Sequence, residues 1–251
     1  MDDYNRREFV KMSLPAFLGV SLTLPSITAF AKQANADRGH VRSDEPINWD
    51  AFIEKVTAEA KKQLDPKRWD EPAYVERAAA LAKRLNLKDP AVKEFLSGYQ
   101  NKNPKFPEFD KMHREKLFEI SLVEFDKGEV IEHHDHPEMT GVILCAKGKL
   151  KVDNYDVFTP EEACEEGGEE EDKGDSLLLK RVGRAQLKRG DVSTLTSKQR
   201  NIHRVSADHF CQVIDIFTPP YDRERIRKSR WFDVDDEPFG EHRDVFEAKV
   251  R

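Results

Sequence analysis

Two histidines, His134 and His136, stand two positions apart in a stretch with the composition of a β-strand. Alternate side chains of a strand project from one face of the sheet, so both imidazoles can reach one metal ion. A third histidine, His203, lies far downstream, beside another strand-like run. Three neutral imidazoles suit a divalent first-row metal and leave coordination positions open for a substrate or dioxygen. The sequence therefore predicts a metal site made of His134, His136 and His203.

The other histidines are weaker candidates. His133 is adjacent to His134 and is expected to point to the opposite face of the strand. His209 is interpreted as a surface or packing residue, and polar surroundings predict exposure for His40, His113 and His242. A barrel that has lost its metal, with the three histidines held in hydrogen bonds, remains the alternative.

The elements that must position these histidines are mostly strands. Apolar residues alternate in short runs separated by glycine-containing turns, at residues 117–125, 139–144, 150–155, 176–182, 192–195, 203–205 and 210–217. Many short strands with such turns indicate an antiparallel sandwich or barrel, which we place at residues 106–221.

A helical segment is expected before the barrel, over residues 48–105. Phe52, Val56 and Ala60 recur at helical spacing, and prolines divide the segment into three short helices. After the barrel, residues 222–251 form a charged tail, for which Trp231, Phe232 and Phe239 are the candidate docking residues.

Residues 1–31 resemble a twin-arginine signal peptide. Arg6 and Arg7 precede an apolar stretch, and the small residues Ala29 and Ala31 predict cleavage before Lys32. Residues 32–47 would then be a linker. The expected location is the periplasm, reached through the twin-arginine export machinery, with no stable membrane insertion after cleavage. An uncut membrane anchor is the alternative. Because this route exports folded proteins, a metal could be loaded in the cytoplasm.

The composition gives no reason to expect nucleic acid or an anionic membrane as a partner. The 251 residues carry a formal net charge of -6, and much of the negative excess lies at residues 161–172, which we interpret as a solvated loop. Of the three cysteines, Cys145 and Cys211 fall in apolar runs and are expected to be buried. Cys164 lies in the acidic run and is either free or paired.

The spacing of Gly128, His134, His136, Gly141 and Gly148 resembles the first motif of the cupins. This resemblance implies a double-stranded β-helix, a jelly-roll-like barrel. Many cupins place a metal-binding glutamate at the position of Gly141 or of the preceding Thr140. Neither residue here is a carboxylate, so the metal would keep a higher positive charge and attract an anionic ligand such as a thiolate.

Four segments resemble the cysteamine dioxygenase and plant cysteine oxidase family of cupins. They carry, in the order of that family, His-Asp-His-Pro-Glu-Met, the run from Gly148 to Asp156, Asn-Ile-His, and the segment that ends in Pro-Pro-Tyr221. The resemblance implies an Fe(II)-dependent thiol dioxygenase, with His134, His136 and His203 as iron ligands. It would use O2 to convert cysteine, a cysteamine-like thiol or an N-terminal cysteine to a sulfinic acid.

Two further residues are candidates for catalysis. Asp215 lies within an apolar strand, where an unpaired carboxylate is costly to bury. It would orient a ligand histidine or bind a substrate amine, unless it only caps the following diproline turn. Tyr221 matches a family position near the substrate, and packing after the diproline is its structural alternative.

The chain departs from the family pattern at Arg200 and Glu138, which both replace glycines, and in the basic stretch at residues 222–231. That stretch favours an acidic group on the substrate. Two other functions remain open. One is a cupin metalloenzyme acting on a substrate that is not a thiol, and the other is a non-catalytic periplasmic binding cupin.

Overall fold

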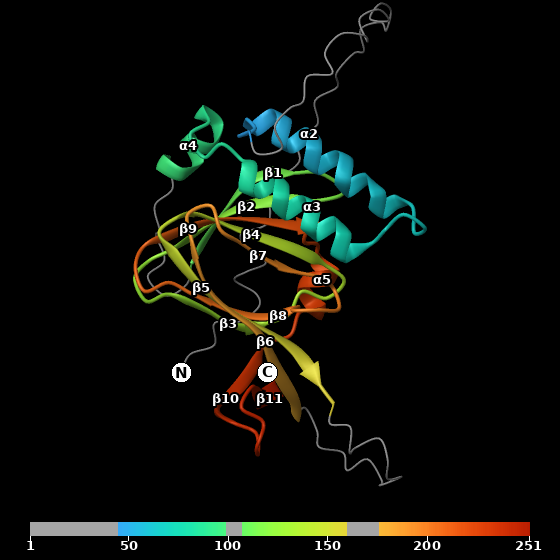
Figure 1. The fold of residues 1–251 in the computed structure, drawn as a ribbon, viewed down its shortest axis with the longest axis vertical. Coiled ribbons are helices and arrows are strands. Elements are labelled where there is room, and N and C mark those ends of the chain that lie inside the picture. Colours follow the sequence, from blue (N-terminus) through green and yellow to red (C-terminus); the bar gives the residue numbers. More distant parts are fainter. Residues whose placement is uncertain (1–44, 99–106, 160–175) are drawn as a thin grey trace, which may run out of the picture. The chain divides into compact units, whose positions relative to one another are not determined.

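The computed structural model describes residues 45–98, 107–159 and 176–251 (Figure 1). The chain divides into Met1–Glu45 and Pro46–Arg251, and the second unit holds all the helices and strands described below. The expected signal peptide, nearly all of the linker, His40, Cys164 and the acidic run lie outside the described residues. Within those residues, no helix is both long enough and apolar enough to cross a membrane.

Among the described residues, three α-helices come first: α2 (Trp49–Ala60), α3 (Glu71–Arg84) and α4 (Pro90–Gly98), with the 3-10 helix η1 (Lys61–Leu64) after α2. The side chains of Asn48 and Asp70 begin α2 and α3 by accepting hydrogen bonds from backbone N–H groups of the first turn. A proline in the first turn of α3 costs no helical hydrogen bond. Local sequence therefore sets where these helices begin.

The strands form two antiparallel sheets. The first has the order β1-β2-β9-β4-β7 and the second the order β10-β11-β6-β5-β8-β3. Their bounds are β1 (Glu108–Arg114), β2 (Glu119–Phe125), β3 (Val130–His134), β4 (Thr140–Lys147), β5 (Lys149–Phe158), β6 (Ser176–Lys188), β7 (Val192–Leu195), β8 (Ile202–Ser206), β9 (Cys211–Thr218), β10 (Phe232–Pro238) and β11 (Val245–Val250). A short helix, α5 (Arg223–Lys228), lies between β9 and β10.

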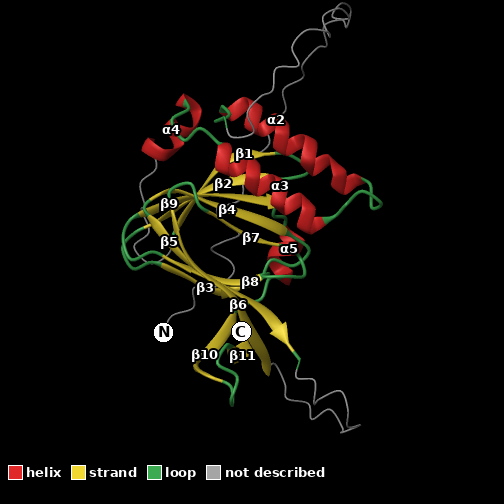
Figure 2. Ribbon diagram, in the orientation of Figure 1, coloured by secondary structure: helices red, strands yellow, loops and turns green. Residues whose placement is uncertain are grey.

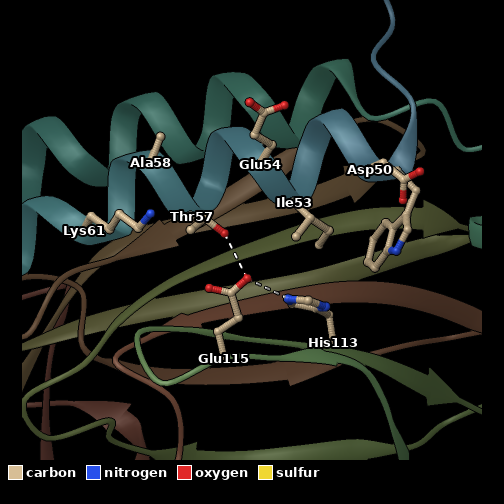
Figure 3. A pocket seen from close by; sticks show the side chains of 9 residues that line it. Asp50, Ile53, Glu54, Thr57, Ala58, Lys61, His113 and Glu115 are labelled. Atoms are coloured by element: carbon tan, nitrogen blue, oxygen red, sulfur yellow. Dashed lines mark hydrogen bonds and ion pairs between the residues drawn. The ribbon is translucent and has the colours of Figure 1, made fainter. Parts of the chain in front are cut away.

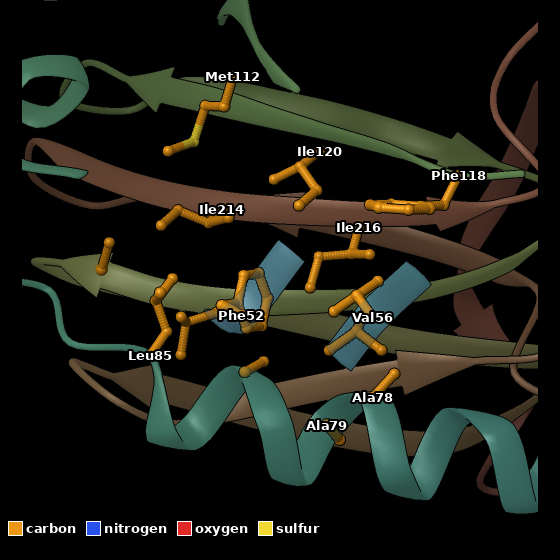
Figure 4. Packing of buried hydrophobic residues seen from close by; sticks show 14 of the residues in the cluster. Phe52, Val56, Ala78, Ala79, Leu85, Met112, Phe118, Ile120, Ile214 and Ile216 are labelled. Carbon is orange, nitrogen blue, oxygen red and sulfur yellow. The ribbon is translucent and has the colours of Figure 1, made fainter. Parts of the chain in front are cut away.

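Helices α2 and α3 cover the outer face of the five-stranded sheet (Figure 2). Phe52 and Val56 of α2 are fully buried against isoleucines of β2 and β9 (Figure 4). Removing such a side chain from water contributes about 1.5–3 kcal/mol to folding. This layer makes the five-stranded sheet apolar on both faces, because its inner face also lines the barrel.

The barrel interior lies between the two sheets. Along β9, Ile214 and Ile216 face the helices, whereas Cys211 and Val213 pack inward with residues of β5 and β8. The alternation places Asp215 and Phe217 on the inner face as well. The architecture is the mainly β cupin barrel with an N-terminal helical segment that the sequence predicts. Cys145 and Cys211 are buried, as expected.

Several elements differ from the expectation. Strand β1 lies where no strand was expected, and β6 runs six residues further than the apolar pattern. The charged tail forms α5, β10 and β11, and β11 extends the second sheet by pairing with β6. Phe232 is fully buried and docks this hairpin, but Phe239 is 42% exposed and does not. These strands were not predicted because polar residues alternate along them. A paired strand can bury one face and leave its other face in water, so its sequence need not be apolar throughout.

Candidate metal centre

The structure brings His134, His136 and His203 together at one point of the barrel. The Nε2 atom of His203 lies 2.9 Å from Nε2 of His136 and 3.1 Å from Nε2 of His134. Imidazole nitrogens that bind one first-row metal at about 2.1 Å and at right angles are about 3 Å apart. These two separations match that arrangement, and the donor atoms of all three histidines lie within 4.8 Å of one another, so the set could hold a single divalent ion with open positions.

Strand pairing places two of the ligands. His134 ends β3 and lies directly opposite His203 of β8. The register of the β3–β8 pair shifts between Ile131 and His134. Because of this irregularity, Ile131 and His134 both face the barrel interior although they are three positions apart. His133 lies outward against Tyr155, with its ring centroid 5.0 Å away, as the sequence predicts for the opposite face.

His136 reaches the same point without being part of a strand. The sequence placed His134 and His136 on one strand, but β3 ends at His134 and His136 lies in the following turn. Asn201 holds this turn. Its side-chain Oδ1 accepts from the backbone N–H of His136 at 2.8 Å, and its Nδ2 donates to the carbonyl of His136 at 3.0 Å. The backbone position of His136 therefore depends on Asn201 rather than on strand alternation.

The surroundings of all three imidazoles favour the neutral form. Burial lowers the pKa of each ring, and the neighbouring histidines lower the pKa of His136 and His203 further. A neutral ring with a bare Nε2 is the form that binds a metal. Nδ1 of His134 donates to the backbone carbonyl of Glu132 at 2.7 Å, which leaves Nε2 free of its proton.

The structure also explains why no carboxylate completes the ligand set. A Cβ atom on Gly141 would lie 2.9 Å from the ring of Phe217 and 3.2 Å from Leu195. The hydroxyl of Thr140 donates to the carbonyl of Thr218 at 2.9 Å. A glutamate at position 141 does not fit without moving Phe217. The Thr140 side chain is already used in its hydrogen bond to Thr218.

Tyr221 lies beside the second ligand. Its hydroxyl is 2.5 Å from Nδ1 of His136, and the rings of Tyr221 and Phe217 are 4.8 Å apart. Burial, followed by the charges of Asp215 and Glu119, raises the pKa of Tyr221 well above its usual value, so the phenol keeps its proton. With a metal on Nε2 of His136, Nδ1–H donates to the phenol oxygen, and the phenol O–H can then donate to another group.

Asp215 is on the inner face of β9, two residues before Phe217. Burial raises the pKa of its carboxyl well above the usual value, and the nearby Glu119 carboxylate raises it further. Its Oδ1 is buried without a hydrogen-bond partner among the described residues. Asp215 makes no hydrogen bond with the three histidines in that part of the chain. No direct contact supports the expected role of Asp215 in orienting a ligand histidine. Its role in binding a substrate amine stays a prediction.

Comparison with known proteins decides the family. Residues 81–249 match the model of the PCO_ADO family. The chain belongs to this family. A probable 2-aminoethanethiol dioxygenase from Dictyostelium discoideum is 27% identical over 116 residues, which cover 46% of this chain and 50% of the relative. The chain thus aligns with only about half the length of that relative.

Solved structures with a similar fold include KdgF from Halomonas sp., which is 17% identical. The match covers 50% of this chain and 88% of KdgF, with a TM-score of 0.35. A cupin-2 domain protein from Shewanella frigidimarina is 13% identical, with coverages of 53% and 93% and a TM-score of 0.34.

The two glycine replacements in this PCO_ADO chain have a shared backbone feature. Glu138 and Arg200 are the two non-glycine residues with positive φ among the described residues, at 61° and 59°. Glycine adopts this left-handed region without a steric cost, whereas other residues do not. Glu138 is exposed and pairs with Lys228 at 2.9 Å, and the Arg200 side chain donates to Asn154 at 3.2 Å.

Basic residues near the site are largely paired already. Lys228 bonds Glu138, Arg225 bonds Asp222, and Arg230 bonds Asp135. The expected preference for an acidic substrate group therefore depends on the other basic side chains of the stretch and stays a prediction.

Sequence reasoning did not identify Asp135, Arg230 or Trp231 as parts of the site. The ring of Trp231 stacks on His134 at 5.0 Å, and Arg230 forms an ion pair with the buried Asp135 at 2.7 Å. The weak signals were the Trp-Phe pair in the tail and an aspartate between two histidines. Neither signal indicates which residue is its partner.

A separate open hollow of 640 Å³ lies between α2 and the end of β1 (Figure 3). None of the three histidines lines it. His113 lines it and bonds Glu115 at 3.2 Å, and its ring also contacts Trp49 and Phe118. The prediction that His113 is exposed is therefore wrong, because it is half-buried under α2. His209 and His242 are exposed, as expected.

Proposed function

We propose that this chain is an iron(II)-dependent dioxygenase that converts a thiol to a sulfinic acid with O2. The proposal depends on one observation above all, the convergence of three imidazole Nε2 atoms at a buried point in a chain of the PCO_ADO family. Iron(II) on His134, His136 and His203 would supply a cation that favours the substrate thiolate and would mediate the transfer of electrons from the sulfur to O2. Both atoms of O2 end on the sulfur, so RSH and O2 give RSO2H.

The chain's own residues keep the centre neutral and dry. The three imidazoles carry no charge, so a thiolate meets no competing protein anion in the ligand set. Met139, Leu195 and Phe217 form an apolar cluster against which Tyr221 packs. This cluster excludes water next to His136. The phenol of Tyr221 would donate a hydrogen bond to the thiolate sulfur or to an oxygen of the sulfinate product.

Asp215 is proposed to bind an amine on the substrate. Its buried carboxyl has an unsatisfied oxygen and a raised pKa, so an ammonium group would convert it to a paired carboxylate. An amine-bearing thiol such as cysteamine, cysteine or a peptide with an N-terminal cysteine has this chemistry. The relative named for 2-aminoethanethiol agrees with this choice.

The decisive experiment is anaerobic reconstitution with Fe(II), followed by air and mass spectrometry of candidate thiols. We expect a gain of two oxygen atoms on an amine-bearing thiol, and no gain with the His203→Ala variant. A panel of phenols and carbon acids, followed by oxygen uptake, tests for a metalloenzyme that acts on other substrates. Iron binding without turnover of any thiol would overturn the proposal.

The role of Asp215 is tested by comparing two substrates. For cysteamine, Asp215→Asn should lower kcat/KM about 10- to 100-fold, because a charged hydrogen bond is worth about 1.5–3 kcal/mol. For 3-mercaptopropionate, which has no amine, the same variant should lose far less. Equal losses for both thiols would show that Asp215 does not recognise an amine.

Export by the twin-arginine route is a separate proposal, based on Arg6, Arg7 and the apolar stretch that follows. The double variant Arg6→Lys, Arg7→Lys should keep the protein in the cytoplasm, as cell fractionation would show. Its iron content should equal that of the exported form, because the metal is loaded before export. Iron found only in exported protein would contradict this order.

A further inference from the structure

The loop that carries two of the metal ligands is bound to the C-terminal part of the chain. Asp135 lies between His134 and His136 and is only 3% exposed. Its carboxylate accepts from the backbone N–H of Arg230 at 2.6 Å and from Nε of Arg230 at 2.7 Å. The N–H of Asp135 donates in return to the carbonyl of Arg230 at 3.1 Å. Three hydrogen bonds therefore link two residues that are 95 positions apart.

The next residue contacts a ligand directly. His134 and Trp231 form an isolated antiparallel bridge, and their rings stack with centroids 5.0 Å apart and planes at 25°. The carbonyl of Trp231 accepts from the N–H of Arg251 at 2.9 Å, so a second backbone contact fixes the position of Trp231. The indole also packs against the barrel core.

The stacking on Trp231 restricts the His134 ring in a way that its hydrogen bond to Glu132 does not. The hydrogen bond from Nδ1 to Glu132 fixes one point of the ring and leaves rotation about that point. A large aromatic plane stacked on the ring removes much of the remaining freedom. Outer contacts of this kind typically change metal affinity 10- to 100-fold when they are lost.

We propose that Trp231 and Arg230 are positioning residues of the metal centre, so that the entry to β10 completes the site. The inference rests on the proposed function only in requiring that the three histidines bind a metal. Trp231 sets the plane of His134, and Arg230 neutralises Asp135 and fixes the turn that carries His136.

Cobalt(II) titration of the metal-free full-length chain, followed by visible absorption, tests the proposal without turnover. Trp231→Leu should weaken cobalt binding 10- to 100-fold, and Trp231→Phe should restore most of the affinity because it keeps an aromatic face. Arg230→Gln should also weaken binding, since Asp135 would be left buried without its cation. The matched control is Trp49→Leu, which removes an indole from the helical layer and should leave cobalt affinity unchanged.

Tryptophan emission gives a second measurement that needs no destabilising change. Cobalt should quench the emission of the wild-type chain, and most of that quenching should be lost in Trp231→Phe but kept in Trp49→Phe and Trp69→Phe. No cobalt binding by the wild type would overturn the metal site itself. Cobalt binding with equal affinity in wild type, Trp231→Leu and Arg230→Gln would overturn only the positioning role.

Discussion

Asp215 shows how a single buried side chain can set the pH response of the site. Its carboxyl lies on the inner face of an apolar strand, and its pKa is raised well above the usual value by burial and then by Glu119. A raised pKa means that the folded state prefers the protonated form. Stability from this preference is present below the unfolded pKa of about 3.9 and is lost as pH rises through the folded value.

We therefore predict that Asp215→Asn stabilises the metal-free protein at neutral pH and changes it little near pH 4. Thermal unfolding of both forms between pH 4 and pH 8 measures the difference. The control is Asp110→Asn on the exposed side of β1, for which no widening difference is expected. A wild type that gains stability over Asp215→Asn as pH rises would contradict the assignment.

The backbone at Glu138 allows a second prediction. A left-handed conformation costs a non-glycine residue about 1–2 kcal/mol, and glycine loses about 0.5–1 kcal/mol more in chain entropy on folding than alanine does. Glu138→Gly should thus stabilise the chain by about 0.5–1 kcal/mol in urea unfolding, even though the exposed pair with Lys228 is lost. Glu138→Ala, which keeps the backbone cost, should not stabilise it.

Helix α3 supports the end of β9, from which Tyr221 extends. The hydroxyl of Tyr74 on α3 lies 2.6 Å from the hydroxyl of Thr218, and both side chains are buried. Burial raises the pKa of Tyr74 to about 12. The helical layer thus reaches the strand end that leads into the Pro-Pro-Tyr221 segment, and the helices contribute to the site without touching the histidines.

A double-mutant cycle tests this connection. Tyr74→Phe and Thr218→Val should each destabilise the chain by about 1–3 kcal/mol, because each leaves a buried hydroxyl unsatisfied. The double variant should cost less than the sum, since neither hydroxyl then remains. Urea unfolding measures all three. Additive losses would show that the two hydroxyls do not interact.

For the whole molecule, metal binding and folding should be coupled by mass action. The ligands come from β3, the turn after it and β8, so the site exists only in the folded chain. Iron(II) at 100 times its dissociation constant should raise the free energy of unfolding by about 2.7 kcal/mol under anaerobic conditions. A chelator should reverse this gain, which thermal unfolding detects. His134→Ala should show no such response, and a metal-induced gain in that variant would place the ion elsewhere.

The sequence by itself determined the class of fold and indicated which residues are candidate metal ligands. Histidine spacing indicated the metal site, because residue type limits which atoms can bind an ion. Alternating apolar residues indicated the barrel, and helical spacing indicated α2 to α4, because burial of one face imposes a period on the chain. The prolines divided the helical segment into three helices, because a proline interrupts a helix through its own backbone.

Tertiary structure decided how the residues of the site meet. His136 is in place because of Asn201, and His134 contacts Trp231 through a bridge between distant segments. Strand alternation alone would have kept His136 on β3. Such contacts depend on loop closure and on the register between strands, and both follow from the packing of the entire barrel. A local pattern carries no record of its distant partner, so only the fold shows that the segment before β10 contacts His134 and Asp135.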